Sequence, residues 1–415
     1  MKRLMFFVLA LAIVLTSFSV GPAAGAAKVT EYTVPTIGDF SGPFAEVFKQ
    51  FAQVQKAVFA WWNDTAGKNM ALKLNMKIYD GRYDASVIAS MWPGILAECK
   101  PIILVGQGGP DAAALQQRLP RDRVPATYGG PTFGYAWLPN QWIFHARPTW
   151  THEMLAGINW YIKAHPEKKP LKFAFMGVNF PPALDQKKGV EKYFQEVLAP
   201  KGLGEFVATE YMDITPVDVS NQVKKFIDSK ADLVGGLSTT AQVSAYIRAC
   251  QLHGVNIPTV GGPHQTIWPL ARAMKTFAPF EGHFVVACHT SVTERNSRAY
   301  QFFQVLQKNY GLDEDAWNPA NMLGFAQSIL TLRAVEHAAN RVGAANLTGQ
   351  AVYDAILAAP FTHEELMGLL PALSYTKDAP FPTGKLRAII ETVKDGKYVL
   401  ATPEWIPVPD DVTKW

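Results

Sequence analysis

Residues 72–105 read LKLNMKIYDGRYDASVIASMWPGILAECKPIILV and carry the pattern from which we predict the fold class. Apolar residues alternate with polar ones at the start, as in a half-buried strand, at Leu72, Leu74, Met76 and Ile78. Helical spacing follows over residues 85–98, and the apolar run 102–105 predicts a second strand. Pro93 lies within the helical pattern, so a kink or an early end of that helix is an alternative. A strand, a helix and another strand in this order predict a parallel pair covered by the helix.

Similar units continue in both directions along the chain. Upstream, residues 31–37 predict a strand, and a helical pattern runs from Val47 to Trp61. A second series of strands is predicted in the middle of the chain, at residues 172–176, 205–212, 233–237 and 259–260. Because strands that alternate with helices form parallel sheets covered on both faces, we predict an α/β fold with two lobes. The first passage between the lobes is expected near residues 142–148.

The first 26 residues have the composition of a cleavable signal peptide. Lys2 and Arg3 form a positive start, residues 4–15 are apolar throughout, and Ala24-Gly25-Ala26 is a small-residue cleavage motif. The apolar run is shorter than the roughly 20 residues that a spanning helix needs. We therefore expect an exported, soluble protein of the periplasm that begins near residue 27, with a retained membrane anchor as the alternative.

The composition excludes several classes of partner. The 415 residues are 48% hydrophobic and 18% charged, which is too apolar for a disordered chain. Lys and Arg number 39 against 35 Asp and Glu, and without Lys2 and Arg3 of the leader the balance is 37 − 35 = +2. A nearly neutral protein is not expected to bind nucleic acid or an anionic membrane. The three cysteines form no disulfide framework, and whether Cys250 and Cys288 pair or remain small buried side chains is open.

The loops that follow the predicted strands offer a candidate binding site. In open parallel sheets, ligands bind beyond the carboxyl ends of the strands, where backbone N–H groups and helix N-termini converge. Six loops follow the predicted strands, and most of them contain glycine or a hydroxyl side chain. They lie at residues 39–42, 106–111, 128–132, 179–180, 238–240 and 262–264. Hydroxyls and free N–H groups at such positions suit a carboxylate or another small anion. The ligand-binding residues that we predict are Phe40, Ser41, Gly108, Gly109, Tyr128, Gly130, Thr132, Phe180, Ser238, Thr239, His264 and Trp268.

The same loops give no support to catalysis. Gly106-x-Gly108 lacks the third glycine of a dinucleotide fingerprint, because position 111 is Asp. His152-Glu153 and His363-Glu364 have no second histidine at the spacing of a zinc site, and no serine lies in a G-x-S-x-G elbow. We therefore expect no enzymatic activity, no cofactor and no metal. Arg147 is expected to pair with a carboxylate between the lobes rather than to contact ligand.

Six short motifs, each loose, are informative through their order and spacing. They are Ile37-Gly38-Asp39-Phe40-Ser41-Gly42-Pro43-Phe44-Ala45, Tyr79-Asp80, Val105-Gly106-Gln107-Gly108, Phe144-His145-Ala146-Arg147-Pro148, Ala231-Asp232-Leu233-Val234 and Cys250-x-x-x-Gly254-Val255-x-Ile257-Pro258. In these motifs the chain resembles the solute-binding components of ABC importers of the branched-chain amino-acid class, the type I periplasmic binding proteins. The resemblance covers essentially the whole mature chain.

The resemblance implies an architecture of two Rossmann-like lobes that are joined by three crossings and close on a small solute. It places lobe 1 at residues 27–147 and 290–343, and lobe 2 at residues 148–289 and 344–415. The implied crossings lie near Arg147, near His289-Thr290 and near Val342-Gly343.

The sequence departs from the family pattern at two implied ligand contacts. The first-lobe loop that usually offers a serine hydroxyl to the ligand carboxylate has Gly108-Gly109 instead. Amino-acid binders place an acid beside the ligand ammonium, where this chain has His264 after Gly261-Gly262-Pro263. A buried ammonium without a carboxylate costs several kcal/mol. The histidine therefore favours an anionic, polar or aromatic solute over an amino acid.

The function that we predict is that of an extracytoplasmic solute-binding subunit of an ABC importer. It is expected to be a monomer that captures a small organic solute, either an amino acid or another carboxylate with an aromatic body, and delivers it to a membrane permease. The alternative is a ligand-binding sensor that presents its closed form to a membrane receptor. A secreted hydrolase is a third class, and no catalytic constellation in the sequence supports it.

Overall fold

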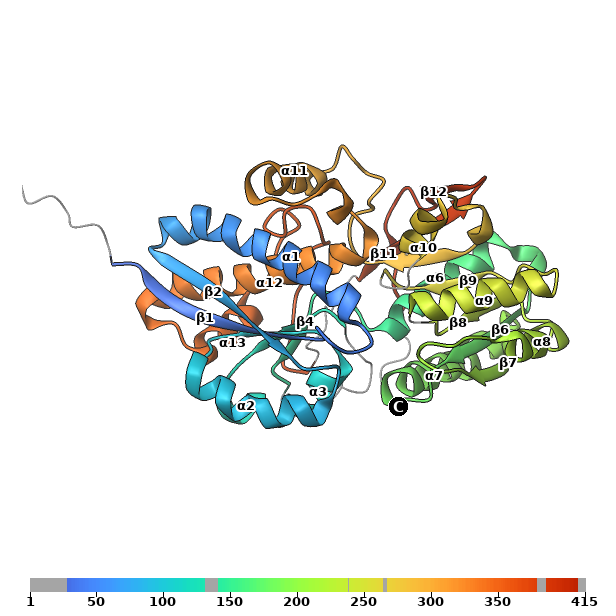
Figure 1. The fold of residues 1–415 in the computed structure, drawn as a ribbon, viewed down its shortest axis with the longest axis horizontal. Helices are drawn as coiled ribbons and strands as arrows, with labels where there is room; N and C mark the ends of the chain where they lie inside the picture. The colour runs from blue at the N-terminus through green and yellow to red at the C-terminus, as the bar shows by residue number, and fades with distance from the viewer. Residues whose placement is uncertain (1–27, 131–140, 238, 264–266, 379–385, 410–415) are drawn as a thin grey trace, which may run out of the picture.

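The computed structural model describes residues 28–130, 141–237, 239–263, 267–378 and 386–409. Two lobes lie next to each other, and each is built on one β-sheet with helices packed on its faces (Figure 1). Most of the strands are parallel, which confirms the predicted α/β fold class.

The first lobe contains five parallel strands in the order β2-β1-β3-β4-β5. Their bounds are Thr30–Gly38 (β1), Leu72–Asp80 (β2), Leu104–Gly106 (β3), Ala126–Tyr128 (β4) and Ile143–His145 (β5). The helices of this lobe are α1 (Ala45–Trp62), α2 (Ala85–Cys99), α3 (Gly109–Leu115), α4 (Leu119–Asp122), α11 (Arg298–Tyr310), α12 (Pro319–Val342) and α13 (Gly349–Ala358).

Helix α2 is stabilised at its first turn and beside its proline. The Asp84 carboxylate accepts the N–H groups of the first turn, at 2.7 Å from Ser86 N. The helix runs to Cys99 without the break that Pro93 suggested. Pro93 cannot donate to the carbonyl of Ala89, four residues earlier, and that carbonyl instead accepts from Arg118 Nη1 at 2.7 Å. A side chain from outside the helix thus replaces the missing backbone bond.

The second lobe contains an eight-stranded sheet, in which seven strands follow the order β12-β11-β10-β9-β8-β6-β7 and the eighth, β13, pairs with β11. The parallel strands are β6 (Leu171–Gly177), β7 (Gly204–Tyr211), β8 (Leu233–Gly235), β9 (Thr259–Gly261) and β10 (Phe284–Ala287). The antiparallel strands are β11 (Arg387–Lys394), β12 (Lys397–Leu400) and β13 (Ile406–Pro407). The helices of this lobe are α6 (Trp150–Ala164), α7 (Pro181–Tyr193), α8 (Ser220–Asp228), α9 (Thr240–Leu252) and α10 (Ile267–Met274).

Short helical turns complete the described elements. Two π-helical turns, Asn63–Gly67 and Phe194–Leu198, extend α1 and α7. Single 3-10 turns lie at Pro166–Lys168, Ala199–Lys201, Ala278–Phe280, Glu314–Ala316 and Ala344–Asn346.

Each lobe has its own apolar interior. The first lobe buries one large core between its sheet and helices, which includes Trp62, Trp92 and Phe144. The second sheet separates two cores, and strand β6 supplies both by alternation. Phe173 and Phe175 enter one core, whereas Ala174 and Met176 enter the other. Two separate interiors allow each lobe to move as a unit.

The chain passes from one sheet to the other after strand β5 and again after strand β10. Strand β5 ends at His145 in the first sheet, and α6 begins at Trp150 in a core of the second lobe. Strand β10 ends at Ala287 in the second sheet, and α11 begins at Arg298 in the core of the first lobe.

The third crossing corrects the prediction. Helix α13 packs against α12, and Leu347, Val352, Phe361, Leu370 and Tyr375 are all buried in the core of the first lobe. Residues 344–375 therefore belong to the first lobe, and the predicted crossing at Val342-Gly343 is wrong. The physical reason is that α13 covers an aromatic surface of that core, where the Tyr353 ring stacks on Trp142 with centroids 4.1 Å apart. The chain returns to the second lobe after Tyr375 and before β11.

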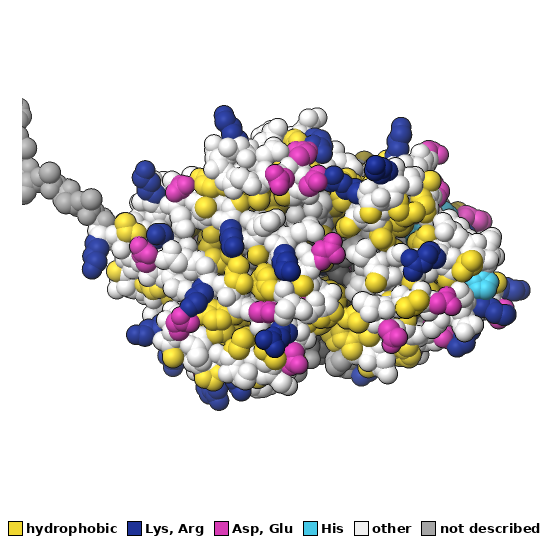
Figure 2. Space-filling model, in the orientation of Figure 1, with side chains coloured by type: hydrophobic (Ala, Val, Ile, Leu, Met, Phe, Trp, Pro, Cys, Tyr) yellow, Lys and Arg dark blue, Asp and Glu magenta, His cyan; other side chains and the backbone are white. Residues whose placement is uncertain are grey.

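Two further expectations concern cysteines and membrane spans. Cys99, Cys250 and Cys288 are buried and free, so Cys250 and Cys288 do not pair. Among the described residues, no helix has the length and apolar character of a membrane span. Figure 2 shows basic and acidic side chains interspersed over both lobes, without a broad patch of one sign on that face.

Two glycines in the first lobe give a matched test of its packing. A methyl group on Gly349 would lie 1.9 Å from the backbone oxygen of Arg123, whereas one on the helical Gly94 would meet nothing within 4 Å. Gly349→Ala is expected to lower the free energy of unfolding by about 1–3 kcal/mol, and Gly94→Ala to raise it by about 0.5–1 kcal/mol. Urea unfolding of both variants measures the difference. Equal stability of the two variants would contradict this packing.

Candidate functional site

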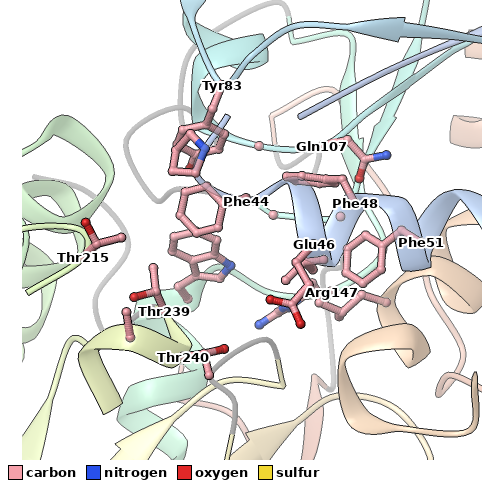
Figure 3. Close-up of a pocket in the computed structure, with 18 residues that line it drawn as sticks. Phe44, Glu46, Phe48, Phe51, Tyr83, Gln107, Arg147, Thr215, Thr239 and Thr240 are labelled. Atoms are coloured by element: carbon pink, nitrogen blue, oxygen red, sulfur yellow. The ribbon is translucent and has the colours of Figure 1, made fainter. Parts of the chain in front are cut away.

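A cavity of about 260 Å³ lies between the two lobes (Figure 3). The first lobe lines it with Pro43, Phe44, Glu46, Val47, Phe48, Phe51, Tyr83, Gln107, Gly108, Gly129, Gly130 and Leu323. Arg147 of the first crossing and Trp150, Thr215, Thr239, Thr240 and Ala241 of the second lobe complete the lining. The cavity lies at the carboxyl ends of strands from both sheets, as expected for open parallel sheets.

The first-lobe wall is aromatic. Phe44, Phe48 and Phe51 follow one another at helical spacing along the start of α1. The Phe48 and Phe51 rings meet edge to face with centroids 5.7 Å apart, and the Phe44 and Tyr83 rings are 4.5 Å apart. Asp39 positions this wall, because its carboxylate accepts the N–H of Phe44 at 2.7 Å. An apolar or aromatic ligand group fits against these rings.

The loop after β3 approaches the cavity at Gly108 but carries a buried acid behind it. Asp111 is 4% exposed, and its carboxylate accepts the N–H of Gln107 at 2.6 Å. Burial raises the pKa of Asp111 to about 7, against the lowering effect of hydrogen bonds from the backbone of Gln107 and Gly108. The N–H groups of this loop that we expected to receive a ligand carboxylate thus already serve the chain's own acid.

The second-lobe side is marked by a buried ion pair. Arg147 and Glu153 are each 2% exposed, and Arg147 Nε donates to Glu153 Oε1 at 2.7 Å while Nη2 donates to Oε2. Burial raises the pKa of Glu153, and the charge of Arg147 opposes that rise. The third nitrogen, Nη1, is buried and has no hydrogen-bond partner in the part of the chain that the structure describes. Arg147 therefore pairs with a carboxylate, as predicted, and also lines the cavity, which the sequence did not predict.

Two buried histidines near this pair are uncharged at neutral pH. Burial, together with the positive charge of Arg147, lowers the pKa of His145 to about 3 and that of His289 to about 4. At neutral pH the positive charge in this region is therefore carried by Arg147 and not by these two histidines. Within the described residues, no group of three or more His, Cys, Asp or Glu side chains is arranged to hold a metal ion.

Helix α9 begins at the cavity with a capping box. The Thr239 hydroxyl accepts the N–H of Gln242 at 3.2 Å, and the Gln242 side chain accepts the N–H of Thr239 at 3.2 Å. The next two backbone N–H groups, of Thr240 and Ala241, belong to the first turn and have no acceptor within the helix. Both residues line the cavity, so this helix presents its positive end there.

The structure brings together only part of the predicted site. Gly108, Gly130 and Thr239 line the cavity. Five predicted residues lie outside its lining, namely Phe40, Ser41, Gly109, Tyr128 and Phe180. Thr132, Ser238 and His264 fall outside the described residues.

Trp268 is placed elsewhere. It lines a separate groove of about 660 Å³ beside the outer face of α1, and its ring packs on Phe277 and Tyr398. Ser41 and Phe40 are engaged with Asp80, which accepts the Ser41 hydroxyl at 2.6 Å and the Phe40 N–H at 2.9 Å. Tyr128 is fully buried and fills the space beside Gly106.

The aromatic residues of α1 are the main lining group that sequence reasoning missed. Val47 and Phe51 were identified only as part of a helical apolar pattern, which is the ordinary signature of core. The available signal is their position directly after the glycine loop that ends β1, because the first turn of such a helix lies at the binding edge of the sheet.

A family model described as periplasmic binding protein matches residues 31–379. A search of curated protein sequences finds no match.

Solved structures share the fold at low sequence identity. A branched-chain amino-acid ABC transporter protein from Thermus thermophilus with bound valine is 15% identical, with a TM-score of 0.76 and coverage of 92% of this chain and 97% of that chain. An ABC transporter substrate-binding protein from Aeropyrum pernix is 16% identical, with a TM-score of 0.77 and the same coverage. A solute-binding protein from R. palustris in complex with benzoate is 15% identical, with a TM-score of 0.72 and coverage of 92% and 99%. The family match spans most of the sequence, so the chain belongs to the periplasmic binding proteins.

Proposed function

We propose that this protein captures a small carboxylate with an apolar or aromatic body and delivers it to the permease of an ABC importer. The observation that carries the proposal is the two-sided cavity between the lobes. One wall presents the Phe44 and Phe48 rings, and the other presents Arg147 and the start of α9. A ligand with an apolar end and an anionic end complements both walls.

The size of the cavity supports a small solute. Its volume is about 260 Å³. A cavity of about 150 Å³ lined by apolar side chains already holds benzene. The larger volume here leaves room for one ring and a carboxylate. The solved relatives with bound valine and with bound benzoate carry ligands of this size class.

Export completes the proposal. Residues 1–26 combine a basic start, an apolar run and the Ala24-Gly25-Ala26 motif, which supports secretion to the periplasm and cleavage near residue 27. An importer subunit of this kind meets its solute outside the cytoplasmic membrane.

The proposal is tested by native mass spectrometry of freshly purified protein, followed by titration calorimetry with benzoate, 4-hydroxybenzoate, phenylacetate and valine. We expect one-to-one binding of at least one carboxylate. Binding of none of them, with folded protein, would reject this solute class. Turnover of a bound compound would instead indicate an enzyme.

Closure of the lobes is the conformational prediction. The separate cores and the short crossings allow rotation of one lobe against the other, and a ligand that contacts both walls favours the closed state. Solution scattering is expected to show a smaller radius of gyration with the carboxylate that binds best in calorimetry. An unchanged radius at saturation contradicts closure.

His264 remains a prediction from the sequence. If it donates to the ligand carboxylate, affinity falls as pH rises through its pKa, about 6.5 for a free side chain. His264→Ala is then expected to remove that pH dependence and to weaken binding by roughly 1.5–3 kcal/mol. Calorimetry of wild type and variant on both sides of that pKa measures the effect. Identical affinities at each pH would remove His264 from the site.

A further inference from the structure

The two walls of the cavity differ in the sign of the charge that they can accept. Behind the first-lobe wall, Asp39 and Asp111 are buried acids, 1% and 4% exposed, and Glu46 lies in the lining itself. Asp111 accepts the N–H of Gln107, so the loop at Gly108 is already supplied with a carboxylate. A ligand carboxylate placed against this loop would find the Gln107 N–H engaged and, close by, an acid that is partly ionised at neutral pH.

The opposite wall offers donors without acceptors. The Arg147 side chain is 2% exposed, two of its nitrogens are bound to Glu153, and Nη1 has no partner among the described residues. Figure 3 shows the Arg147 side chain between the α1 aromatic rings and the start of α9 at Thr239 and Thr240. A guanidinium that already holds one carboxylate on one edge can bind a second carboxylate through its remaining N–H groups.

The start of α9 reinforces the same wall. The capping box of this 13-residue helix engages Thr239 and Gln242, and the N–H groups of Thr240 and Ala241 in the first turn have no acceptor within the helix. These donors and Arg147 belong to the same lining, so one carboxylate can be approached by both.

We propose that the second-lobe wall, through Arg147 and the first turn of α9, holds the carboxylate of the solute, while its apolar body lies on the Phe44 and Phe48 rings of the first lobe. This inference rests on the proposed function and specifies the orientation of the solute. The sequence analysis assigned the carboxylate to no single loop and named His264, after a strand of the second lobe, as a donor to it.

The orientation has a consequence for selectivity. With one carboxylate at Arg147, a second carboxylate at the far end of the solute would approach the loop of Gln107 and Gly108, behind which the buried Asp111 accepts the Gln107 N–H. The site therefore selects monocarboxylates, and terephthalate is expected to bind at least tenfold more weakly than benzoate.

The test is titration calorimetry of the full mature chain with benzoate, 4-hydroxybenzoate, valine and terephthalate. Arg147→Lys keeps a positive charge beside Glu153 but removes the second edge of the guanidinium, so benzoate affinity should fall about 10- to 100-fold. The matched control is Arg298→Lys, the same change in an exposed ion pair with Glu364, and it should leave the affinity within about twofold.

A second variant tests the helix independently of Arg147. Thr240→Pro removes one N–H at the first helical position, where proline is well tolerated after an extended residue such as Thr239. It should weaken benzoate binding about tenfold relative to Thr240→Ala, which removes only the hydroxyl. Asp111→Asn should reduce the difference in affinity between benzoate and terephthalate.

The outcomes separate the two proposals. Binding of benzoate, 4-hydroxybenzoate or valine that is unchanged in Arg147→Lys and in Thr240→Pro overturns the orientation alone. Stronger benzoate binding in Asp111→Asn also overturns it, because the carboxylate would then lie at the first-lobe loop. If wild type binds none of the three carboxylates, both the solute class and the orientation are rejected.

Discussion

Arg147→Met is expected to lower the free energy of unfolding by about 3–5 kcal/mol near neutral pH. The substitution leaves the Glu153 carboxylate buried, at 2% exposure, without the two hydrogen bonds that Arg147 donates. The attraction of the Arg147 charge, which offsets most of the desolvation cost of that carboxylate, is then lost, and only the hydrogen bond from Cys288 remains. Urea unfolding followed by tryptophan fluorescence measures the loss, since the chain contains 11 tryptophans.

A double variant separates this effect from the loss of packing. Arg147→Met combined with Glu153→Leu removes both charges, and apolar replacement of a whole buried pair is often neutral or stabilising by about 1–4 kcal/mol. The double variant should therefore recover most of the stability. In the single variant the loss should also shrink as the pH falls, because Glu153 can take up a proton and enter the neutral form. A double variant that is no more stable than Arg147→Met contradicts the explanation by charge burial.

The strands and helices near the start of the chain were predictable because their signals are local. The alternation at residues 72–78 places one side of β2 toward the core, and Asp84 caps the helix that follows. The effect of Pro93 was not predictable from local sequence, because the group that satisfies the Ala89 carbonyl is Arg118, almost 30 residues away.

The lobe to which α13 belongs could not be predicted from the sequence pattern of that helix. The amphipathic pattern of α13 requires an apolar partner but does not identify it. The partner is the core of the first lobe, where Tyr353 meets Trp142 and Phe144. Such contacts join residues about 200 positions apart in sequence, so the third crossing could not be placed from periodicity.

The site was predictable where it depends on strand ends and unpredictable where it depends on side-chain geometry. Gly108, Gly130 and Thr239 line the cavity because each follows a parallel strand of one of the two sheets. The prediction from the sequence that Arg147 pairs with a carboxylate is confirmed. It could not show that a bidentate pair with Glu153 leaves Nη1 beside the cavity, because that depends on the direction of the guanidinium.

The difference in unfolding free energy between Glu391→Gln and wild type is expected to change by about 3 kcal/mol between about pH 4.5 and pH 8. Glu391 is fully buried in β11, where it accepts the Ser291 hydroxyl at 2.6 Å and the Tyr398 hydroxyl at 3.1 Å. Burial raises its pKa to about 7, and the hydrogen bonds from Ser291 and Tyr398 oppose the rise. The folded state therefore binds this proton more tightly than the unfolded chain does.

The sign of the effect follows from that difference in pKa. The stabilising contribution of protonated Glu391 is fully present below the unfolded pKa, near 4.3, and is lost as pH rises through the folded pKa of about 7. Glutamine does not titrate, so the variant should gain about 3 kcal/mol relative to wild type as the pH is raised through this window. Wild type and variant share the buried His145, His283 and His289, so their difference in unfolding free energy at each pH isolates Glu391. The control is Glu364→Gln, at an exposed glutamate that pairs with Arg298. Its difference in unfolding free energy from wild type should change by less than about 0.5 kcal/mol over the same pH range. A difference between Glu391→Gln and wild type that stays flat with pH would show that Glu391 does not keep its proton in the folded state.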